Sequence, residues 1–149
     1  MGMWESVKGW LGGAWRRNAP DAPDEDSGAW GEAQAARYLR GKGFRVLGRR
    51  VRVGDRDELD LVCRDGEVLV FVEVKTRGGE DFGRPASAVD AKKRHVMSRA
   101  AVRYLKKLRY PRIYYRFDVV EVVGHPGGEP AIRHIESAFV LDPHYRPPY

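Results

Sequence analysis

The chain has 149 residues, of which 42% are hydrophobic and 32% charged, as expected of a soluble globular protein with one buried core. Its single cysteine excludes an internal disulfide and a multi-cysteine zinc site. No run approaches the roughly eighteen apolar residues of a transmembrane helix, so we expect no stable membrane insertion. Because the N-terminus also lacks a signal-peptide pattern, we expect a cytoplasmic protein.

The net charge of +6 is unevenly distributed along the chain. The segment 84–116 contains eleven Lys or Arg and one acid, whereas the rest of the chain has more acids than bases. Such a concentrated basic segment favours a polyanionic partner, in particular a nucleic acid, although a basic segment can also simply be a solvated surface.

Composition divides the chain into a central domain and two tails. Residues 1–27 combine a Trp-rich start with a stretch of prolines and acids, which predicts a flexible tail and an acidic linker. An amphipathic tail that rests on a membrane surface or a partner is the alternative for the Trp-rich part. We expect the folded domain at 28–140 and an irregular C-terminal tail at 141–149, where prolines recur.

The first predicted element is a helix from Ser27, a good N-cap, to Arg40, ended by Gly41 and Gly43. Alternating apolar residues then predict strands at 44–53, 58–63 and 67–76. A long basic helix is predicted at 87–108, followed by a strand at 114–123 and a short edge strand at 131–135. This order predicts an α/β domain with a mixed, mostly antiparallel sheet flanked by helices.

The turn between the second and third strands sets the predicted register of that hairpin. If Asp65-Gly66 is the centre of the turn, residues whose numbers sum to 131 lie opposite each other. Asp60 then faces Phe71 and is the diagonal neighbour of Glu73, with Cβ atoms roughly 7 Å apart. The opposite face of the hairpin is entirely apolar, with Leu59, Leu61 and Cys63 opposite Val72, Val70 and Val68.

Two carboxylates at that separation can share one cation, and their oxygen ligands favour Mg²⁺ or Mn²⁺. Asp60 and Glu73, assisted by the Val74 carbonyl, are therefore the predicted metal ligands. Lys75 lies two residues beyond Glu73 on the same face, where its ammonium can orient a water or stabilise charge on a phosphoryl group. Taken alone, a Glu-x-Lys sequence on a strand is more often a solvated pair.

Outside the hairpin, Glu32 shares a helical stripe with apolar residues and is a further candidate catalytic acid; the alternative is a solvated acid near a helix N-terminus. The predicted nucleic-acid-binding residues lie on the basic helix and are Lys92, Lys93, Arg94, Arg99 and Arg103. The four histidines, His95, His125, His134 and His144, show no metal-ligand spacing in the sequence, and we assign them no role.

Several ordered motifs resemble the YraN-like family: G-E-A-Q-A-A-R-Y-L at 31–39, D-E-L-D-L-V at 57–62, V-F-V-E-V-K-T-R at 70–77 and F-G-R-P-A-S-A-V at 82–89. This largely uncharacterised bacterial family is predicted to be endonuclease-like. The resemblance implies a restriction-endonuclease-like core of the PD-(D/E)xK type, similar to archaeal Holliday-junction resolvases. It maps the family's helix glutamate, strand aspartate and Glu-x-Lys onto Glu32, Asp60, Glu73 and Lys75.

The resemblance therefore implies a metal-dependent endonuclease that hydrolyses phosphodiester bonds in DNA, including branched or structured DNA. A nucleic-acid-binding protein that keeps the nuclease fold without physiological cleavage is the alternative. Junction-cutting enzymes act as symmetric dimers, so a homodimer is expected by analogy. One departure is Asp57, where the family usually has Gly, and this extra acid stands next to the predicted metal site.

Overall fold

The computed structural model describes residues 27–79 and 89–147. The described chain contains, in order, α2 (Ser27–Gly41), β1 (Arg45–Val53), β2 (Asp57–Asp65), β3 (Val68–Arg77), α3 (Ala91–Lys107), β4 (Tyr114–Val123) and β5 (Ala131–Phe139). Of the predicted N-terminal tail and linker, residues 1–26 lie outside the described ranges.

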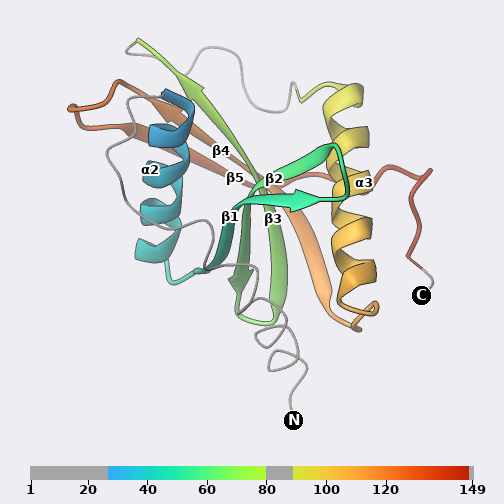
Figure 1. Ribbon diagram of the computed structural model, residues 1–149. Helices are drawn as coiled ribbons and strands as arrows, with labels where there is room; N and C mark the ends of the chain where they lie inside the picture. The colour runs from blue at the N-terminus through green and yellow to red at the C-terminus, as the bar shows by residue number, and fades with distance from the viewer. Residues whose placement is uncertain (1–26, 80–88, 148–149) are drawn as a thin grey trace.

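The five strands form one sheet in the order β1-β2-β3-β4-β5, as Figure 1 shows. All neighbouring strands are antiparallel except β3 and β4, which run parallel. A parallel pair requires a crossover from one end of the sheet to the other, and α3 lies in this connection. The predicted mixed, mostly antiparallel sheet with flanking helices is confirmed.

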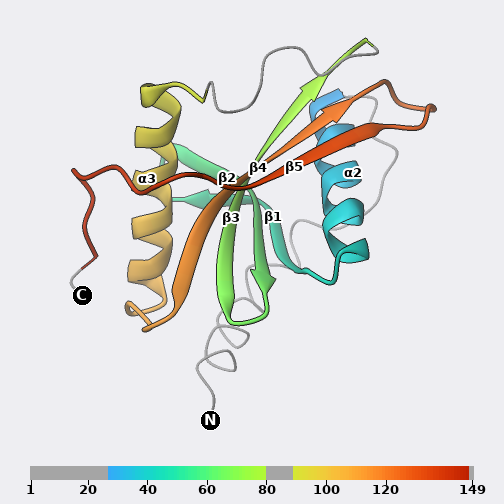
Figure 2. The same ribbon diagram turned by 180° about the vertical axis from the view of Figure 1, so that it is seen from behind.

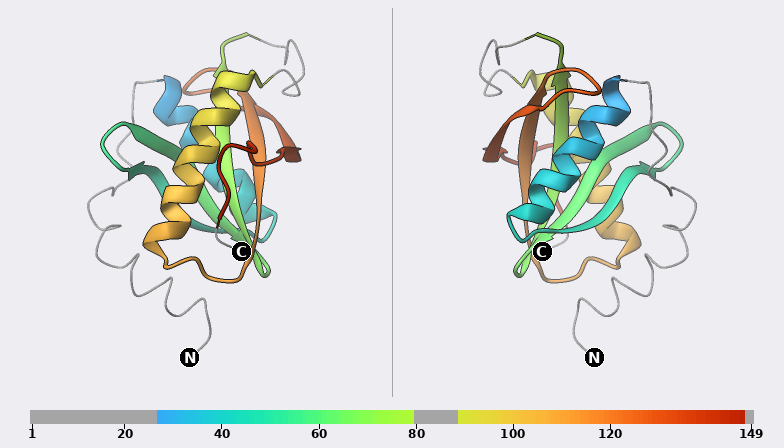
Figure 3. Two further views of the ribbon diagram at one scale, coloured as in Figure 1. Left: turned by 90° about the vertical axis from the view of Figure 1, so that its right-hand side faces the viewer. Right: turned by 90° about the vertical axis from the view of Figure 1, so that its left-hand side faces the viewer.

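One helix covers each face of the sheet, as the side views in Figure 3 show. The α2 helix buries Ala35 and Leu39 against a cluster that includes Val72. On the other face, Tyr104 of α3 packs edge-on against Phe71, with ring centroids 5.6 Å apart. Fully burying an apolar side chain of this size contributes roughly 1.5–3 kcal/mol, so these two clusters hold both helices on the sheet. Neither helix has the length and apolar character needed to cross a bilayer.

The predicted register of the β2–β3 hairpin is wrong by two residues. Leu61 pairs with Val72 and Asp65 with Val68, so the two loop residues are Gly66 and Glu67 rather than Asp65 and Gly66. Gly66 has φ +59°, and glycine at the first position of a two-residue loop is typical of a type II′ turn. A shift by two residues keeps each side chain on its predicted face.

Continuing this register past Leu61 would place Asp60 opposite Glu73 rather than diagonal to it, and would move Glu58 away from Glu73. Leu59 is a second correction: it packs under α3 with Val53, not in the α2 cluster that contains Leu61. The β2–β3 pairing ends at Leu61 and Val72, so the beginning of β2 is free to bend towards α3, as Figure 1 shows.

Two element boundaries differ from the prediction by about four residues. The α3 helix begins at Ala91 rather than near Ser87, because the Asp90 carboxylate accepts a hydrogen bond of 2.7 Å from the Lys93 backbone N–H and caps the helix. The last strand extends to Phe139 instead of ending at Ile135. An irregularity between Phe117 and Val119 lets β5 continue along β4.

Candidate active site

Asp60 lies where β2 separates from β3. Beyond the Leu61–Val72 pair, Asp60 Oδ2 accepts a hydrogen bond of 2.8 Å from the Val74 backbone N–H. The carboxylate therefore takes the place that a backbone carbonyl would occupy in a continuous ladder. Because the N–H and C=O of one strand residue point towards the same neighbouring strand, the Val74 carbonyl is directed to the Asp60 side of β3.

Glu73 places a second carboxylate beside Asp60. Its side chain is 13% exposed, and its Oε1 lies 3.1 Å from Nζ of Lys93 on α3. Burial and the neighbouring Glu73 charge raise the pKa of Asp60 to about 7, although the Val74 N–H and the Lys93 charge act in the opposite direction. Internal contacts thus neutralise this pair incompletely, and a divalent cation would relieve the repulsion.

Lys75 is half-buried on β3, two residues beyond Glu73. Strand alternation places its side chain on the same face of the sheet as Glu73. Across the parallel β3–β4 pair, Lys75 is in register with Glu121. Within the part of the chain that the structure describes, no hydrogen bond or ion pair involves the Lys75 ammonium.

Glu32 approaches this pair from α2. Gly31 allows this helix to lie close to β3, because a Cβ at that position would clash with Thr76. Glu32 Oε2 accepts a hydrogen bond of 2.6 Å from Arg50 Nε. Burial raises the pKa of Glu32, the Arg50 hydrogen bond lowers it, and the Asp60 charge raises it further. The oxygens of Glu32, Asp60 and Glu73 do not all lie within 4.8 Å of one another, so Glu32 is an outer member of the site.

The predicted nucleic-acid-binding residues fall into two groups. Lys92, Arg94 and Arg103 are exposed along α3. Lys93 and Arg99 instead make internal ion pairs, Lys93 with Glu73 and Arg99 with Asp57. Lys92 and Arg94 are available to a phosphate backbone, whereas Arg103, although exposed, also lies 3.8 Å from the Asp57 carboxylate. The Lys93 and Arg99 pairs anchor α3 to the sheet.

Asp57 is the anchor that sequence reasoning did not identify. It is 4% exposed and accepts two hydrogen bonds from Arg99, of 2.8 and 2.7 Å. Arg103 lies 3.8 Å from the same carboxylate. The Arg99 hydrogen bonds hold the pKa of Asp57 below its usual range. The signal in the sequence was the i, i+4 spacing of Arg99 and Arg103, which places both guanidiniums on one side of α3.

Asp118 on β4 is another buried acid that the sequence did not single out. It is fully buried, and it accepts hydrogen bonds from both nitrogens of the Arg116 fork (3.0 and 3.2 Å), from His134 Nε2 (2.7 Å) and from the Ser137 N–H (3.0 Å). Burial alone would raise its pKa, but these hydrogen bonds hold the pKa of Asp118 below its usual value. Groups of the protein itself therefore stabilise the Asp118 carboxylate.

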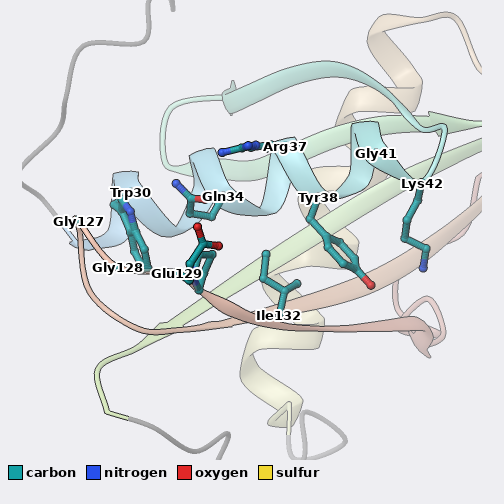
Figure 4. Close-up of a pocket in the computed structure, with 11 residues that line it drawn as sticks. Trp30, Gln34, Arg37, Tyr38, Gly41, Lys42, Gly127, Gly128, Glu129 and Ile132 are labelled. Carbon is teal, nitrogen blue, oxygen red and sulfur yellow. The ribbon is translucent and has the colours of Figure 1, made fainter.

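A separate hollow of about 620 Å³ lies between α2 and the β4–β5 turn. Figure 4 shows Trp30, Gln34 and Tyr38 of α2 facing Glu129 and Ile132 across it. None of the four predicted catalytic residues lines this hollow, so it is not part of the candidate active site.

The chain matches the uncharacterised protein family UPF0102 over residues 31–122. A UPF0102 protein of Symbiobacterium thermophilum is 46% identical over 112 residues, covering 75% of this chain and 94% of that protein. Relatives in Nocardia farcinica (46% identical over 114 residues, covering 75% and 87%) and Chlorobaculum tepidum (43% over 119 residues, covering 76% and 92%) carry the same family name. The matched region contains the candidate site, and the chain belongs to the UPF0102, or YraN-like, family.

Proposed function

We propose that the chain is a Mg²⁺- or Mn²⁺-dependent endonuclease that hydrolyses phosphodiester bonds in DNA. The observation that carries this proposal is the Asp60–Glu73 pair: two adjacent, largely buried carboxylates, with the pKa of Asp60 raised to about 7. Strongly perturbed carboxylates with a nearby lysine are characteristic of functional sites. A restriction-endonuclease-like core is part of the proposal, supported by the order of one helix, three antiparallel strands, a crossover helix and a parallel strand.

The side chains present fit a hard divalent cation. Asp60, Glu73 and the Val74 carbonyl form an all-oxygen donor set, which Mg²⁺ and Mn²⁺ prefer over softer ligands. When bound, such an ion supplies Lewis-acid polarisation of a phosphoryl oxygen and increases the acidity of water. The Lys75 ammonium would orient the attacking water and stabilise negative charge that develops on the phosphoryl group. Glu32 would hold Arg50 and add negative charge behind Asp60.

DNA would approach along the exposed side of α3. Lys92, Arg94 and Arg103 would neutralise backbone phosphates, which provides affinity without reading sequence. Binding of this kind weakens as salt concentration rises, because condensed counterions are released on complex formation. A two-fold symmetric dimer, which would present two such sites to a branched substrate, remains a prediction that light scattering can test.

The deciding experiment measures cleavage of branched, flapped, single-stranded and duplex DNA by the purified chain with Mg²⁺, Mn²⁺ or EDTA. We expect metal-dependent cleavage that is lost in Asp60→Asn, Glu73→Gln and Lys75→Ala. Glu58→Gln is the matched control, because Glu58 is an exposed acid on the same strand as Asp60. Cleavage that survives in Glu73→Gln, or that Glu58→Gln abolishes equally, would contradict the assignment.

A second candidate function is nucleic-acid binding without cleavage, and the Lys93–Glu73 ion pair favours it. The Lys93 ammonium lies 3.1 Å from Glu73 Oε1 and neutralises part of the negative charge that would otherwise attract a metal ion. Calorimetric titration with Mn²⁺ separates the two functions. Saturable binding that Asp60→Asn removes supports the enzyme, whereas DNA binding with no Mn²⁺ binding supports the non-cleaving protein.

A further inference from the structure

Two histidines and an aspartate meet where the C-terminal segment lies on α3. His95 comes from α3, while Asp142 and His144 follow β5, in the segment that Figure 2 shows reaching α3. The potential ligand atoms of these three residues all lie within 4.8 Å of one another. His95 Nδ1 is 3.0 Å from Asp142 Oδ2, and His144 Nδ1 is 2.8 Å from Asp142 Oδ1. One carboxylate thus stands between two imidazole nitrogens.

Neighbouring groups fix the orientation of this cluster. The Asp142 backbone N–H donates a hydrogen bond of 2.9 Å to Ser98 Oγ, which places the carboxylate beside α3. The Tyr145 hydroxyl lies 2.9 Å from His95 Nε2, and its oxygen can accept a hydrogen bond from the N–H of that nitrogen. A metal-bound histidine commonly uses one ring nitrogen for the metal and donates the other N–H to a nearby oxygen, and His95 already has this arrangement.

The spacing is close to that of a tetrahedral metal site. Metal–ligand bonds of about 2.0–2.2 Å place neighbouring ligand atoms roughly 3.3–3.5 Å apart. The two contacts to Asp142, at 3.0 and 2.8 Å, would need to lengthen by about half an ångström. The His144 side chain is 82% exposed, so it has room to adjust, and water can reach the open side of the cluster.

We propose that His95, Asp142 and His144 bind a transition-metal ion of the Zn²⁺ class, with water completing the coordination. Two imidazoles and one carboxylate favour Zn²⁺, Co²⁺ or Ni²⁺ over Mg²⁺, so this site differs in chemistry from the Asp60–Glu73 pair. Bound metal would tie the C-terminal segment to a helix that begins some fifty residues earlier in the chain.

The test titrates the full-length chain, without a histidine tag, with Co²⁺, whose visible absorption reports tetrahedral coordination. We expect one saturable site per chain that Zn²⁺ displaces. His144→Ala should abolish the signal, and Tyr145→Phe should weaken binding by about tenfold or more, because it removes the partner of the second His95 nitrogen. His125→Ala is the matched control, since His125 is exposed and lies outside the cluster.

Absence of a saturable Co²⁺ signal would overturn this proposal, as would a signal that is equal in His144→Ala and the unmodified chain. A second measurement is the melting temperature, which Zn²⁺ should raise in the unmodified chain but not in His144→Ala. Asp60→Asn should keep the Co²⁺ signal while losing Mn²⁺ binding. Failure of the proposed nuclease function would therefore leave this site unaffected, and the reverse also holds.

Discussion

Asp118 and Asp60 show two ways in which one sheet accommodates a buried carboxylate. Asp118 receives hydrogen bonds from Arg116, His134 and the Ser137 N–H, and its pKa is lowered despite complete burial. Asp60 receives one backbone hydrogen bond and has Glu73 as its neighbour, and its pKa is raised to about 7. The fold thus supplies Asp118 with several hydrogen-bond donors and a guanidinium, whereas Asp60 has a second carboxylate beside it. This contrast supports the proposal that Asp60 belongs to a cation-binding site rather than to a structural ion pair.

The largest expected effect separates the two acids by activity. Asp60→Asn should reduce DNA cleavage on the order of a thousandfold, equivalent to about 4 kcal/mol of transition-state stabilisation. Asp118→Asn should change the rate by less than about threefold at a temperature where the variant stays folded, since Asp118 has no role in the proposed chemistry. Single-turnover cleavage rates test this contrast, and equal losses in both variants would contradict it.

Of the two aspartate-to-asparagine substitutions, only Asp118→Asn should destabilise the metal-free protein. Asp118→Asn leaves the Arg116 charge beside a neutral amide, with His134 also deprived of its carboxylate, and breaking a buried ion pair costs roughly 3 kcal/mol. Urea unfolding measures the loss. If Asp118→Asn were as stable as the unmodified chain, the internal partners of Asp118 would not account for its lowered pKa.

Asp60→Asn should instead stabilise the metal-free protein above neutral pH. The pKa of Asp60 rises from an unfolded value of 3.8 to about 7, so Asp60 favours folding most below pH 3.8, and this contribution is lost as pH rises through 7. Asparagine carries no charge at any pH. In EDTA, the free energy of unfolding of Asp60→Asn should therefore exceed that of the unmodified chain by little at pH 4 and by on the order of 4 kcal/mol at pH 8. An advantage that is constant with pH would contradict the raised pKa.

Glu32→Gln should produce the smallest effect. Removing this charge takes a negative neighbour away from Asp60, which lowers the pKa of Asp60. NMR titration of the Asp60 carboxyl carbon should show a slightly lower pKa in the variant than in the unmodified chain. The titration curve of Asp118 should not change and serves as an internal control. An increase for Asp60 would indicate that Glu32 acts mainly by holding Arg50 in place.

Local patterns were sufficient to predict the elements and the hairpin residues of the candidate site. Strand alternation placed Glu73 and Lys75 on one face of β3, and the two-residue register error left this assignment unchanged because side chains repeat every two residues. Alternation did not predict the change of face at Leu59, where β2 has left β3. The register itself depended on the backbone conformation of Gly66, with φ +59°. Either candidate turn contained that glycine, so composition alone could not choose between them.

Contacts between distant segments could not be predicted in the same way. Arg99 binds Asp57, 42 residues earlier, and His95 binds Asp142, 47 residues later. No helical or strand period connects residues so far apart, and each contact depends on how α3 lies on the sheet. Three predicted nucleic-acid-binding residues, Lys93, Arg99 and Arg103, consequently lie beside acids of the sheet. His144, which is far from His95 in the sequence, lies close to it in the fold.

The separation of β2 from β3 also explains why the site uses one short acid and one long acid. Asp60 reaches only to the adjacent strand, where it binds the Val74 N–H, while Glu73 extends to Lys93 on α3. Exchanging the two acids by Asp60→Glu and Glu73→Asp would preserve the net charge and the amino-acid composition. The exchanged side chains would be one methylene too long for the first contact and one too short for the second, so the two carboxylates are not interchangeable.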